Sequence, residues 1–551
     1  MRARLLLPLV LLLAGCALAP AADPPAARLA ALVEAHFDEA LALDPVGATF
    51  LGDHRFDDRL GDPASAAHFE AMLALERRYL AAARELDPAA LGGQDRLTWD
   101  IFVRERERAI AGARFPARLL PVEQQYSLPL IVAMLGSGGS AQPFATPADH
   151  ERWLARAAGV PQAFDSIIAA MREGVRAGVT QPRVVMERVL PQLESLIAPA
   201  EESLFYGPVR GLPESLPEAE RTALAARYRA LIETTLNPAY ARLRDFIRDE
   251  YLPACRETVG WSALPDGAAW YDFHVAAQTT TTLGADEIHA IGLAEVARIR
   301  GEMERIIREL GFEGGFHDFL ADLRSNPRFY YPTSDELFQA YLSISKRIDP
   351  LLSPLFRTLP RTPYGVRPIP MSIAPDTTTA YYMPPSSDGL RPGYYYVNLY
   401  RPEQRPKYEM AVLSVHEAVP GHHLQIALAQ ELPAAPMFRR FADFTAFVEG
   451  WALYSESLGG EMGLYDDPYD HFGYLTYDMW RAVRLVVDTG LHHEGWSREQ
   501  AIDYFRENAA KSELDIVNEI DRYIGWPGQA LAYKIGQLRI RALRAEAEQS
   551  L

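Results

Sequence analysis

The chain has 551 residues, of which 48% are hydrophobic and 23% are charged, and this composition is typical of a globular protein. Its length allows two to four domains or one large two-lobed enzyme with a substantial hydrophobic core. The formal net charge of −18 at pH 7 argues against nucleic-acid binding, because that binding requires Lys and Arg side chains clustered against phosphates.

The N-terminus has the pattern of a bacterial lipoprotein signal. Two arginines precede an apolar run that is too short to span a bilayer, and the run ends in LAGC at residues 13–16. We predict a signal peptide over residues 1–15, acylation of Cys16 and an Ala/Pro-rich tether over residues 16–27. Ala17 rather than aspartate follows the cysteine, which favours the outer membrane, facing the periplasm. The alternative is plain secretion to the periplasm, with cleavage after Ala19.

Helical periodicity dominates the rest of the chain. We expect an N-terminal helical region over residues 28–260 and a second helical region, which carries the candidate site, over residues 261–551. One segment differs, because a turn cluster at residues 384–389 precedes the β-prone sequence YYYVNLY at residues 394–400. The predicted fold is therefore mainly α, large and two-lobed, with a small β element beside the helix that carries the site.

The sequence HEAVPGHH begins like the H-E-x-x-H motif of zinc hydrolases but has Pro420 where the second histidine would stand. Residues 407–419 are apolar enough for a buried helix that presents His416 and Glu417 to an interior cleft. In zinc hydrolases the first histidine binds the metal and the adjacent glutamate takes a proton from the attacking water. An HE pair also occurs by chance, so it needs further ligands.

An acidic ligand is expected on a second helix, because a catalytic zinc site has three protein ligands and an open position. The sequence DFTAFVEGWALYSESLGG supplies Glu449 among apolar and aromatic neighbours, where a carboxylate is costly unless a cation compensates it. A structural ion pair is the alternative. Glu456 lies two turns further along on nearly the same face, and we interpret it as a structural residue, either supporting the site or solvated at the helix end.

Five ordered motifs carry a resemblance to a known family: YYMPPSSDGLRPGYYYVNLY, HEAVPGHHLQ, FVEGWALYSE, RLVVDTGLHHEGWS and RYIGWPGQALAYKIG. Together they resemble the bacterial domain of unknown function 885 family, over about residues 28–545. That family is placed among the gluzincin-like metallopeptidases, distant relatives of the mostly helical angiotensin-converting-enzyme and oligopeptidase groups. The resemblance implies Zn²⁺ held by His416, His422 and Glu449, with Glu417 as the general base.

The spacing of the histidines requires a distorted helix. In a continuous helix His422 would lie about 240° around the axis from His416. The two nitrogens must approach within roughly 4 Å to share a zinc ion. Pro420 lacks an N–H and its ring crowds the carbonyl of residue 416, and Gly421 tolerates unusual backbone angles. We therefore expect the helix to deform there, delivering His422 to the metal and leaving His423 either to support the site from behind or to contact substrate.

Four further candidates complete the predicted site. Arg484 and Asp488 stand four residues apart, and they form either a structural ion pair or, through the guanidinium, a clamp for a substrate carboxylate. His492 and Tyr533 are candidates to donate a hydrogen bond to the oxyanion of the hydrolytic intermediate.

The predicted strand over residues 394–400 is the remaining candidate for substrate binding. It would align an extended peptide by edge pairing, with Tyr396 and Asn398 as contacts, or its tyrosines would serve as ordinary packing.

The sequence thus predicts a mainly helical zinc metallopeptidase, tethered to a bacterial membrane, that hydrolyses peptide bonds by metal-activated water. The imidazole-rich ligand set favours zinc over magnesium or calcium. A zinc amidase acting on cell-wall peptides would keep the same site and differ in its cleft. A non-catalytic peptide-binding lipoprotein would have no need of Glu417 beside His416.

Overall fold

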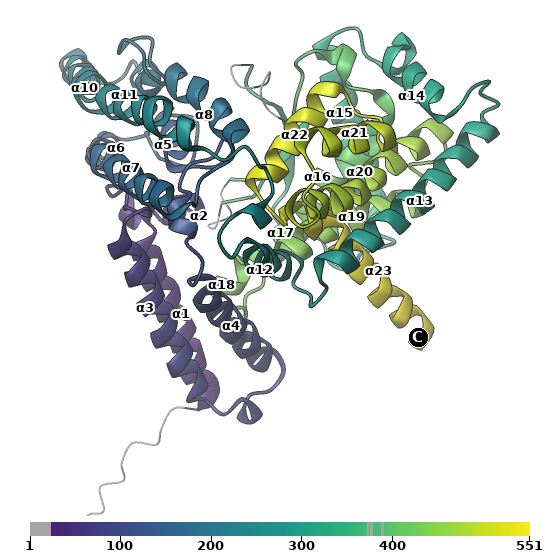
Figure 1. The fold of residues 1–551 in the computed structure, drawn as a ribbon, viewed down its shortest axis with the longest axis horizontal. Coiled ribbons are helices and arrows are strands. Elements are labelled where there is room, and N and C mark those ends of the chain that lie inside the picture. The colour runs from purple at the N-terminus through teal and green to yellow at the C-terminus, as the bar shows by residue number, and fades with distance from the viewer. Residues whose placement is uncertain (1–23, 372–373, 375–377, 387–388, 390) are drawn as a thin grey trace, which may run out of the picture.

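The computed structural model describes residues 24–551 except 372–373, 375–377, 387–388 and 390 (Figure 1). The predicted signal peptide, Cys16 and most of the tether lie outside the described residues. Within the described part of the chain, no helix is both long and apolar enough to cross a membrane. Helices form most of the structure and three strands form one small sheet, which confirms the predicted fold class.

Most of helices α1–α11 lie on one side of the molecule and most of helices α12–α23 on the other, but the short helix α18 lies beside α4 (Figure 1). Three of the N-terminal helices form a projecting arm with its own hydrophobic cluster: α1 (Pro25–Leu43), α3 (Ala66–Arg84) and α4 (Gly93–Gly112). The other N-terminal helices are α2 (Pro45–Leu51), α5 (Leu128–Gly136), α6 (Pro147–Ala157), α7 (Val160–Ala177), α8 (Arg183–Ser195), α9 (Gly207–Arg210), α10 (Glu218–Leu231) and α11 (Asn237–Phe246).

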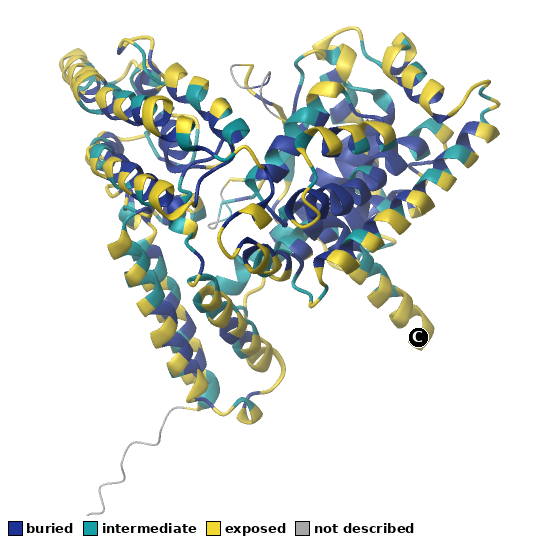
Figure 2. Ribbon diagram, in the orientation of Figure 1, coloured by how far each residue is buried: buried dark blue, intermediate teal, exposed yellow. Residues whose placement is uncertain are grey.

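The C-terminal half is built around one long buried helix, α20 (Pro468–His492), whose interior position is visible in Figure 2. Asp467 caps its N-terminus by accepting a hydrogen bond from the Tyr469 amide. The surrounding helices are α12 (Gly267–Thr279), α13 (Ala285–Glu309), α14 (Phe316–Ser325), α15 (Ser334–Ile348), α16 (Met410–Glu417), α17 (His422–Gln430), α18 (Met437–Arg440), α19 (Thr445–Glu461), α21 (Arg498–Asn508), α22 (Glu513–Gly525) and α23 (Ala532–Ser550).

Two close helix contacts hold this half together. A Cβ on Gly292 of α13 would lie 2.7 Å from the Leu485 side chain on α20, so glycine is needed where these helices touch. Gly536 of α23 approaches α19 still more closely, because a Cβ there would lie 1.9 Å from the Ala446 carbonyl oxygen. The packing thus fixes α19 against α23, and α19 carries the acidic residues of the candidate site.

Buried charge also links the central helices. Asp478 of α20 accepts a 2.6 Å hydrogen bond from the ammonium of Lys534 on α23, and both side chains are fully buried. Although burial opposes ionisation, the Lys534 charge lowers the pKa of Asp478 to about 2. A buried pair of this kind is costly to break because it leaves an uncompensated charge.

The two halves share one hydrophobic cluster, which includes Trp153 of α6 and Val483 of α20. The core therefore continues past residue 260, and the domain boundary expected there stays a prediction.

The sheet has the strand order β1-β3-β2, with β1 (Tyr364–Pro368) parallel and β2 (Ala380–Met383) antiparallel to β3 (Gly393–Val397). The predicted strand over residues 394–400 is thus the central strand, and it ends at Val397. After the strand ends, the side-chain amide of Asn398 donates to the carbonyl oxygens of Ala374 and Thr378, and these bonds hold the chain where it leaves the sheet.

Candidate metal centre

The helix that carries His416 breaks after Glu417, as the sequence predicts. Ala418 and Gly421 leave the helical region, and the Val419–Pro420 peptide bond is cis. The Gly421 amide reaches back to the Val415 carbonyl at 3.0 Å, so the chain folds tightly against the end of α16 before α17 begins at His422. A Cβ on Gly421 would lie 2.0 Å from the His416 carbonyl oxygen, which makes glycine necessary here.

The break is anchored to α19. The Pro420 carbonyl oxygen accepts hydrogen bonds from the Trp451 indole at 2.8 Å and from the Ser455 hydroxyl at 3.2 Å. Trp451 and Ser455 follow Glu449 on α19. These bonds therefore fix the position of the histidine segment relative to the helix that carries Glu449.

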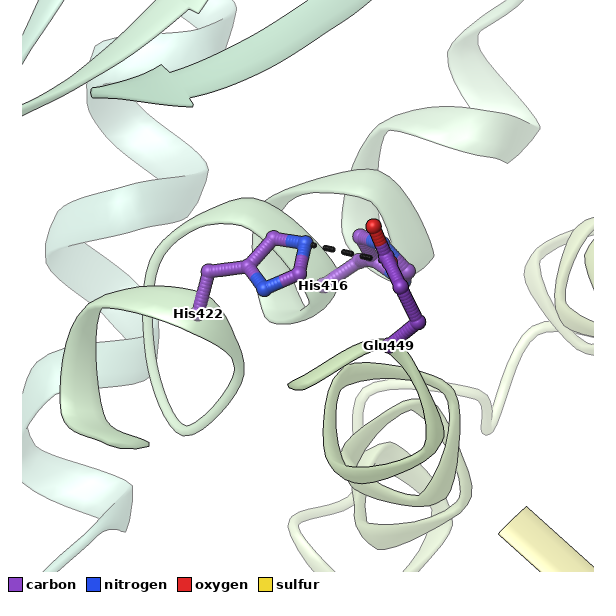
Figure 3. Close-up of side chains that lie close together, drawn as sticks. All are labelled: His416, His422 and Glu449. Carbon is purple, nitrogen blue, oxygen red and sulfur yellow. Dashed lines mark ion pairs between the residues drawn. The ribbon is translucent and has the colours of Figure 1, made fainter. Parts of the chain in front are cut away.

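Three donor groups converge at this point, and Figure 3 shows them pointing toward one another. The Glu449 Oε2 atom lies 3.7 Å from His416 Nε2 and 3.5 Å from His422 Nε2. One ligand atom from each of the three side chains lies within 4.8 Å of the others. The deformation at Pro420 therefore brings His422 beside His416, as expected.

Glu456 orients the first histidine. Its Oε1 atom accepts a 2.7 Å hydrogen bond from His416 Nδ1, which leaves His416 Nε2 facing Glu449. Burial opposes protonation of His416, but the carboxylates of Glu449 and Glu456 outweigh it and raise its pKa to about 9. Glu456 is fully buried, so it supports the site and is not a solvated charge at the helix end.

The donor set fits a zinc ion. Two imidazoles and one carboxylate are a ligand combination of catalytic zinc sites, and their spacing suits bonds of about 2 Å. Among the described residues, the buried Glu449 Oε2 atom has no hydrogen-bond partner. Although burial opposes its ionisation, the two histidines lower the pKa of Glu449 well below its usual range. A buried, charged carboxylate oxygen that faces two imidazole nitrogens is the arrangement that a cation would complete.

Glu417 lies in the same pocket, a cavity of about 540 Å³, which is within the usual size range of ligand sites. The pocket is lined by Gln125, Thr378, Thr379, Ala380, Tyr381, Tyr382, Leu413, His416, Glu417, His422, Ile426, Asp443, Val448, Glu449, Tyr477, Trp480, Arg481, Arg484, Glu519, Arg522, Trp526 and Tyr533. The predicted ligands, the predicted base and two other candidates, Arg484 and Tyr533, therefore share one cavity.

The predicted ion pair between Arg484 and Asp488 is wrong. Arg484 instead donates to Glu519 at 2.9 Å and to the Tyr523 hydroxyl at 2.7 Å. Asp488 points away to the Tyr271 hydroxyl, at 2.6 Å. Both residues are on α20, but each is drawn to a partner on another element.

His492 does not belong to the site. Its Nδ1 atom accepts a hydrogen bond from the Trp261 amide at 3.2 Å, and its Nε2 atom donates to the Tyr523 carbonyl at 3.0 Å. Burial lowers its pKa to about 3, so the ring is neutral. With both nitrogens bound to backbone and no place in the pocket lining, His492 cannot serve an oxyanion.

Of the two interpretations of the strand, peptide pairing at its edge is wrong, because β3 is paired on both sides, and its tyrosines serve in packing instead. Tyr396 stacks on Tyr381, with ring centroids 4.8 Å apart, and Asn398 is fully buried in the turn. Neither lines the pocket. The neighbouring strand β2 does, through Ala380, Tyr381 and Tyr382.

His423 has a supporting position behind the pocket. Its Nε2 atom donates to the Thr362 carbonyl at 3.0 Å and its Nδ1 atom accepts from the Tyr382 hydroxyl at 2.8 Å. Burial lowers its pKa to about 4. His423 therefore holds Tyr382, which lines the cavity, and is itself absent from the lining. Of its two predicted roles, this position fits support of the site and not a substrate contact.

Sequence reasoning missed Glu519 and Arg522 of α22, both of which line the pocket. Their spacing of three residues on an amphipathic helix is typical of a solvated surface pair. The only signal was the motif RYIGWPGQ, which begins at Arg522 and was part of the family resemblance.

Fold and site together define a mainly helical protein with a buried cluster of two histidines and one glutamate beside a large pocket. The chain belongs to the family described as "Bacterial protein of unknown function (DUF885)", which it matches over residues 45–551. The resemblance expected from the five motifs is thereby confirmed at the level of the family.

Two solved structures share the fold. A predicted lipoprotein from Colwellia psychrerythraea is 28% identical, with a TM-score of 0.87, over 95% of this chain and 93% of its own. A predicted lipoprotein of unknown function from Shewanella oneidensis is 18% identical, with a TM-score of 0.72, over 95% of this chain and 94% of its own. None of the curated proteins matches the chain.

Proposed function

We propose that the protein is a zinc-dependent peptidase of the gluzincin-like type. The observation that carries the proposal is the convergence of His416, His422 and Glu449 in one pocket with Glu417, the residue next to the first histidine. When bound, zinc would polarise the substrate carbonyl and make a water molecule more acidic.

Glu417 acts as the general base. It takes a proton from the attacking water and passes it to the nitrogen of the leaving amine. Because water rather than a side chain attacks the carbonyl carbon, no covalent intermediate with the protein forms. Tyr533 donates a hydrogen bond to the oxyanion. Burial and the charge of Glu449 raise the pKa of Tyr533, which keeps the phenol protonated at neutral pH.

Strand β2 aligns the substrate. In the described part of the chain one edge of β2 pairs with β3 and no strand pairs with the other. Because Ala380, Tyr381 and Tyr382 line the pocket, an extended peptide could add to this edge beside the zinc ligands.

The protein is also proposed to be a lipoprotein of the cell envelope, anchored at Cys16 to the outer membrane and facing the periplasm. The LAGC sequence and the similarity to two predicted lipoproteins support this placement. Cys16→Ser should move the protein from the membrane fraction to the soluble fraction, and unchanged membrane association would refute the anchor.

The proposed activity is tested with purified protein in two steps. Elemental analysis should find one zinc per chain, and mass spectrometry of a diverse peptide mixture should reveal cleavage products that a chelator abolishes and added zinc restores. Protein that carries stoichiometric zinc but leaves every peptide intact would contradict the proposal.

A further inference from the structure

Three arginines that the zinc chemistry does not require line the same pocket: Arg481 and Arg484 on α20, and Arg522 on α22. We call them the arginine cluster. Arg481 and Arg484 lie one helical turn apart, and both guanidinium groups contact Trp480, 4.5 Å and 4.6 Å from its ring centroid. Arg484 and Arg522 both contact Glu519, at 2.9 Å and 3.5 Å, so the three guanidinium groups form one connected wall of the cavity.

Arg484 is fixed by several contacts, but one of its nitrogen atoms has no hydrogen-bond acceptor within the described residues. Its ring contacts include Tyr533, at 4.4 Å, and its Nε and Nη2 atoms bond to Tyr523 and Glu519. Only 3% of the residue is exposed, yet Nη1 is buried without a hydrogen-bond partner in the described residues. A buried guanidinium N–H without an acceptor is unfavourable, so a ligand that supplied an acceptor would stabilise Arg484.

The other two arginines are also incompletely paired. Arg481 is 4% exposed, and its closest carboxylate oxygen belongs to Glu456, at 3.7 Å. Arg522 lies 3.5 Å from Glu519. In both residues the buried Nε atom lacks a partner within the described structure.

The charges on this wall do not balance. Glu519 is shared by Arg484 and Arg522, and these guanidinium groups lower its pKa to about 2 although burial opposes its ionisation. Glu456 lies near Arg481 but also accepts the hydrogen bond of His416. The three arginines carry three positive charges, but the carboxylates paired with them are Glu519 and Glu456, and Glu456 is shared with His416. The excess of positive charge favours the binding of an anion at this wall.

We propose that the arginine cluster binds the C-terminal carboxylate of a peptide, so that the enzyme is an exopeptidase that removes residues from the C-terminal end. The proposal rests on the proposed peptidase activity for the cleavage itself. Arginine suits this task because its planar group donates two parallel hydrogen bonds to a carboxylate.

The arginine cluster and the proposed zinc ligands line the same cavity and are linked through Glu456. Arg481 contacts Glu456, which in turn bonds His416. Tyr533 lies 4.4 Å from the Arg484 guanidinium group, measured to its ring centroid, and lines the same pocket as the proposed ligand Glu449. A carboxylate bound by the cluster would thus bring a bond near the chain end into the cavity that also contains Glu417.

The test compares the affinities of matched peptides for the Glu417→Gln protein, in which the peptides survive. Calorimetry would measure an N-acetylated tripeptide as the free acid, as the C-terminal amide, and as an amide whose last residue is glutamate. The free acid should bind about 10-fold tighter than its amide or better, as expected for a hydrogen-bonded ion pair. Adding Arg484→Gln should reduce that ratio to below about 2-fold.

Two further variants control the comparison. Arg544→Gln removes an exposed arginine that pairs with Glu461 and should leave the ratio unchanged. Arg481→Gln, whose contacts to other charges are longer, should also reduce the ratio and serves if Arg484→Gln fails to fold. Equal affinity for acid and amide, or a ratio that survives both pocket variants, would overturn the proposal.

The remaining outcomes separate the two proposals. If the glutamate amide binds as tightly as the free acid, the cluster recognises a side-chain carboxylate and the assignment to the chain end is overturned. If wild-type protein cleaves free and amidated peptides equally well, the peptidase stands and the clamp falls. Selective binding of the free acid without hydrolysis by the wild type would leave the clamp and remove the peptidase.

Discussion

Glu456 should set the zinc affinity of the site without touching the metal. Its Oε1 atom accepts the 2.7 Å hydrogen bond from His416 Nδ1, and its side chain is fully buried. A carboxylate in this position fixes the imidazole so that Nε2 faces the ion and makes that nitrogen more basic. Glu456→Gln keeps an oxygen that can accept the bond but removes the charge.

The magnitude follows from what each variant removes. Loss of such a supporting partner typically weakens metal binding by about 10–100-fold, or about 1.4–2.8 kcal/mol. Because glutamine preserves the hydrogen bond, Glu456→Gln should lie near the lower end, about 10-fold. Glu456→Ala also frees the imidazole to rotate and leaves Arg481 without its nearest carboxylate, so it should approach about 100-fold.

The assay is a competition for zinc between the protein and a fluorescent chelator at neutral pH. Glu461→Gln is the matched control, because Glu461 is on the same helix but is 41% exposed and pairs with Arg544 at the surface. Its zinc affinity should equal that of the wild type. Unchanged affinity in both Glu456 variants would refute the reasoning, as would an equal loss in the control.

Three other predictions concern the break and the core. His422→Ala should abolish zinc retention and activity, whereas His423→Ala should keep zinc with lower activity; metal analysis that finds the reverse would exchange their roles. Gly421→Ala forces a Cβ to within 2.0 Å of a carbonyl oxygen and should lose zinc, while Gly460→Ala, with open space around it, should not; equal zinc contents would refute this explanation. Asp478 stabilises the fold above about pH 4, and this contribution of about 2–3 kcal/mol is lost as the pH falls from about 4 to about 2, since its folded pKa is about 2 against a usual 3.8. Asp478→Asn should therefore be less stable at neutral pH and lose less stability on acidification in thermal unfolding, and an unaltered pH profile would contradict this assignment.

Local chemistry made the histidine break predictable. Pro420 cannot continue a helix, and two late histidines are useful to a metal only if the chain folds back, so the sequence contained both the cause and the consequence. The position of Glu449 beside the two histidines was predictable for a similar reason, because a carboxylate among aromatic residues is costly without a compensating partner.

Partners that come from distant segments were not predictable. Arg484 and Asp488 have ideal spacing for an ion pair, but Glu519 and Tyr271 approach from other helices and take their place. Nothing in the sequence indicates that the backbone groups of Trp261 and Tyr523, which are distant along the chain, bond both ring nitrogens of His492.

Strand order was beyond the reach of sequence pattern as well. The segment with the strongest β propensity forms β3, the central strand, and β1 and β2 pair with its two edges. The weaker segment Ala380–Met383 was left to line the pocket.

The most direct test of the zinc-peptidase proposal is the hydrolysis rate of the Glu417→Gln protein at a zinc content equal to that of the wild type. Glu417 lies in the pocket beside the proposed ligand His416 but is not one of the three converging donors, so the variant should retain zinc and fold normally. Removal of a general base should lower the rate by about 100-fold or more. A zinc-loaded variant that hydrolyses peptides at the wild-type rate would contradict the proposed mechanism.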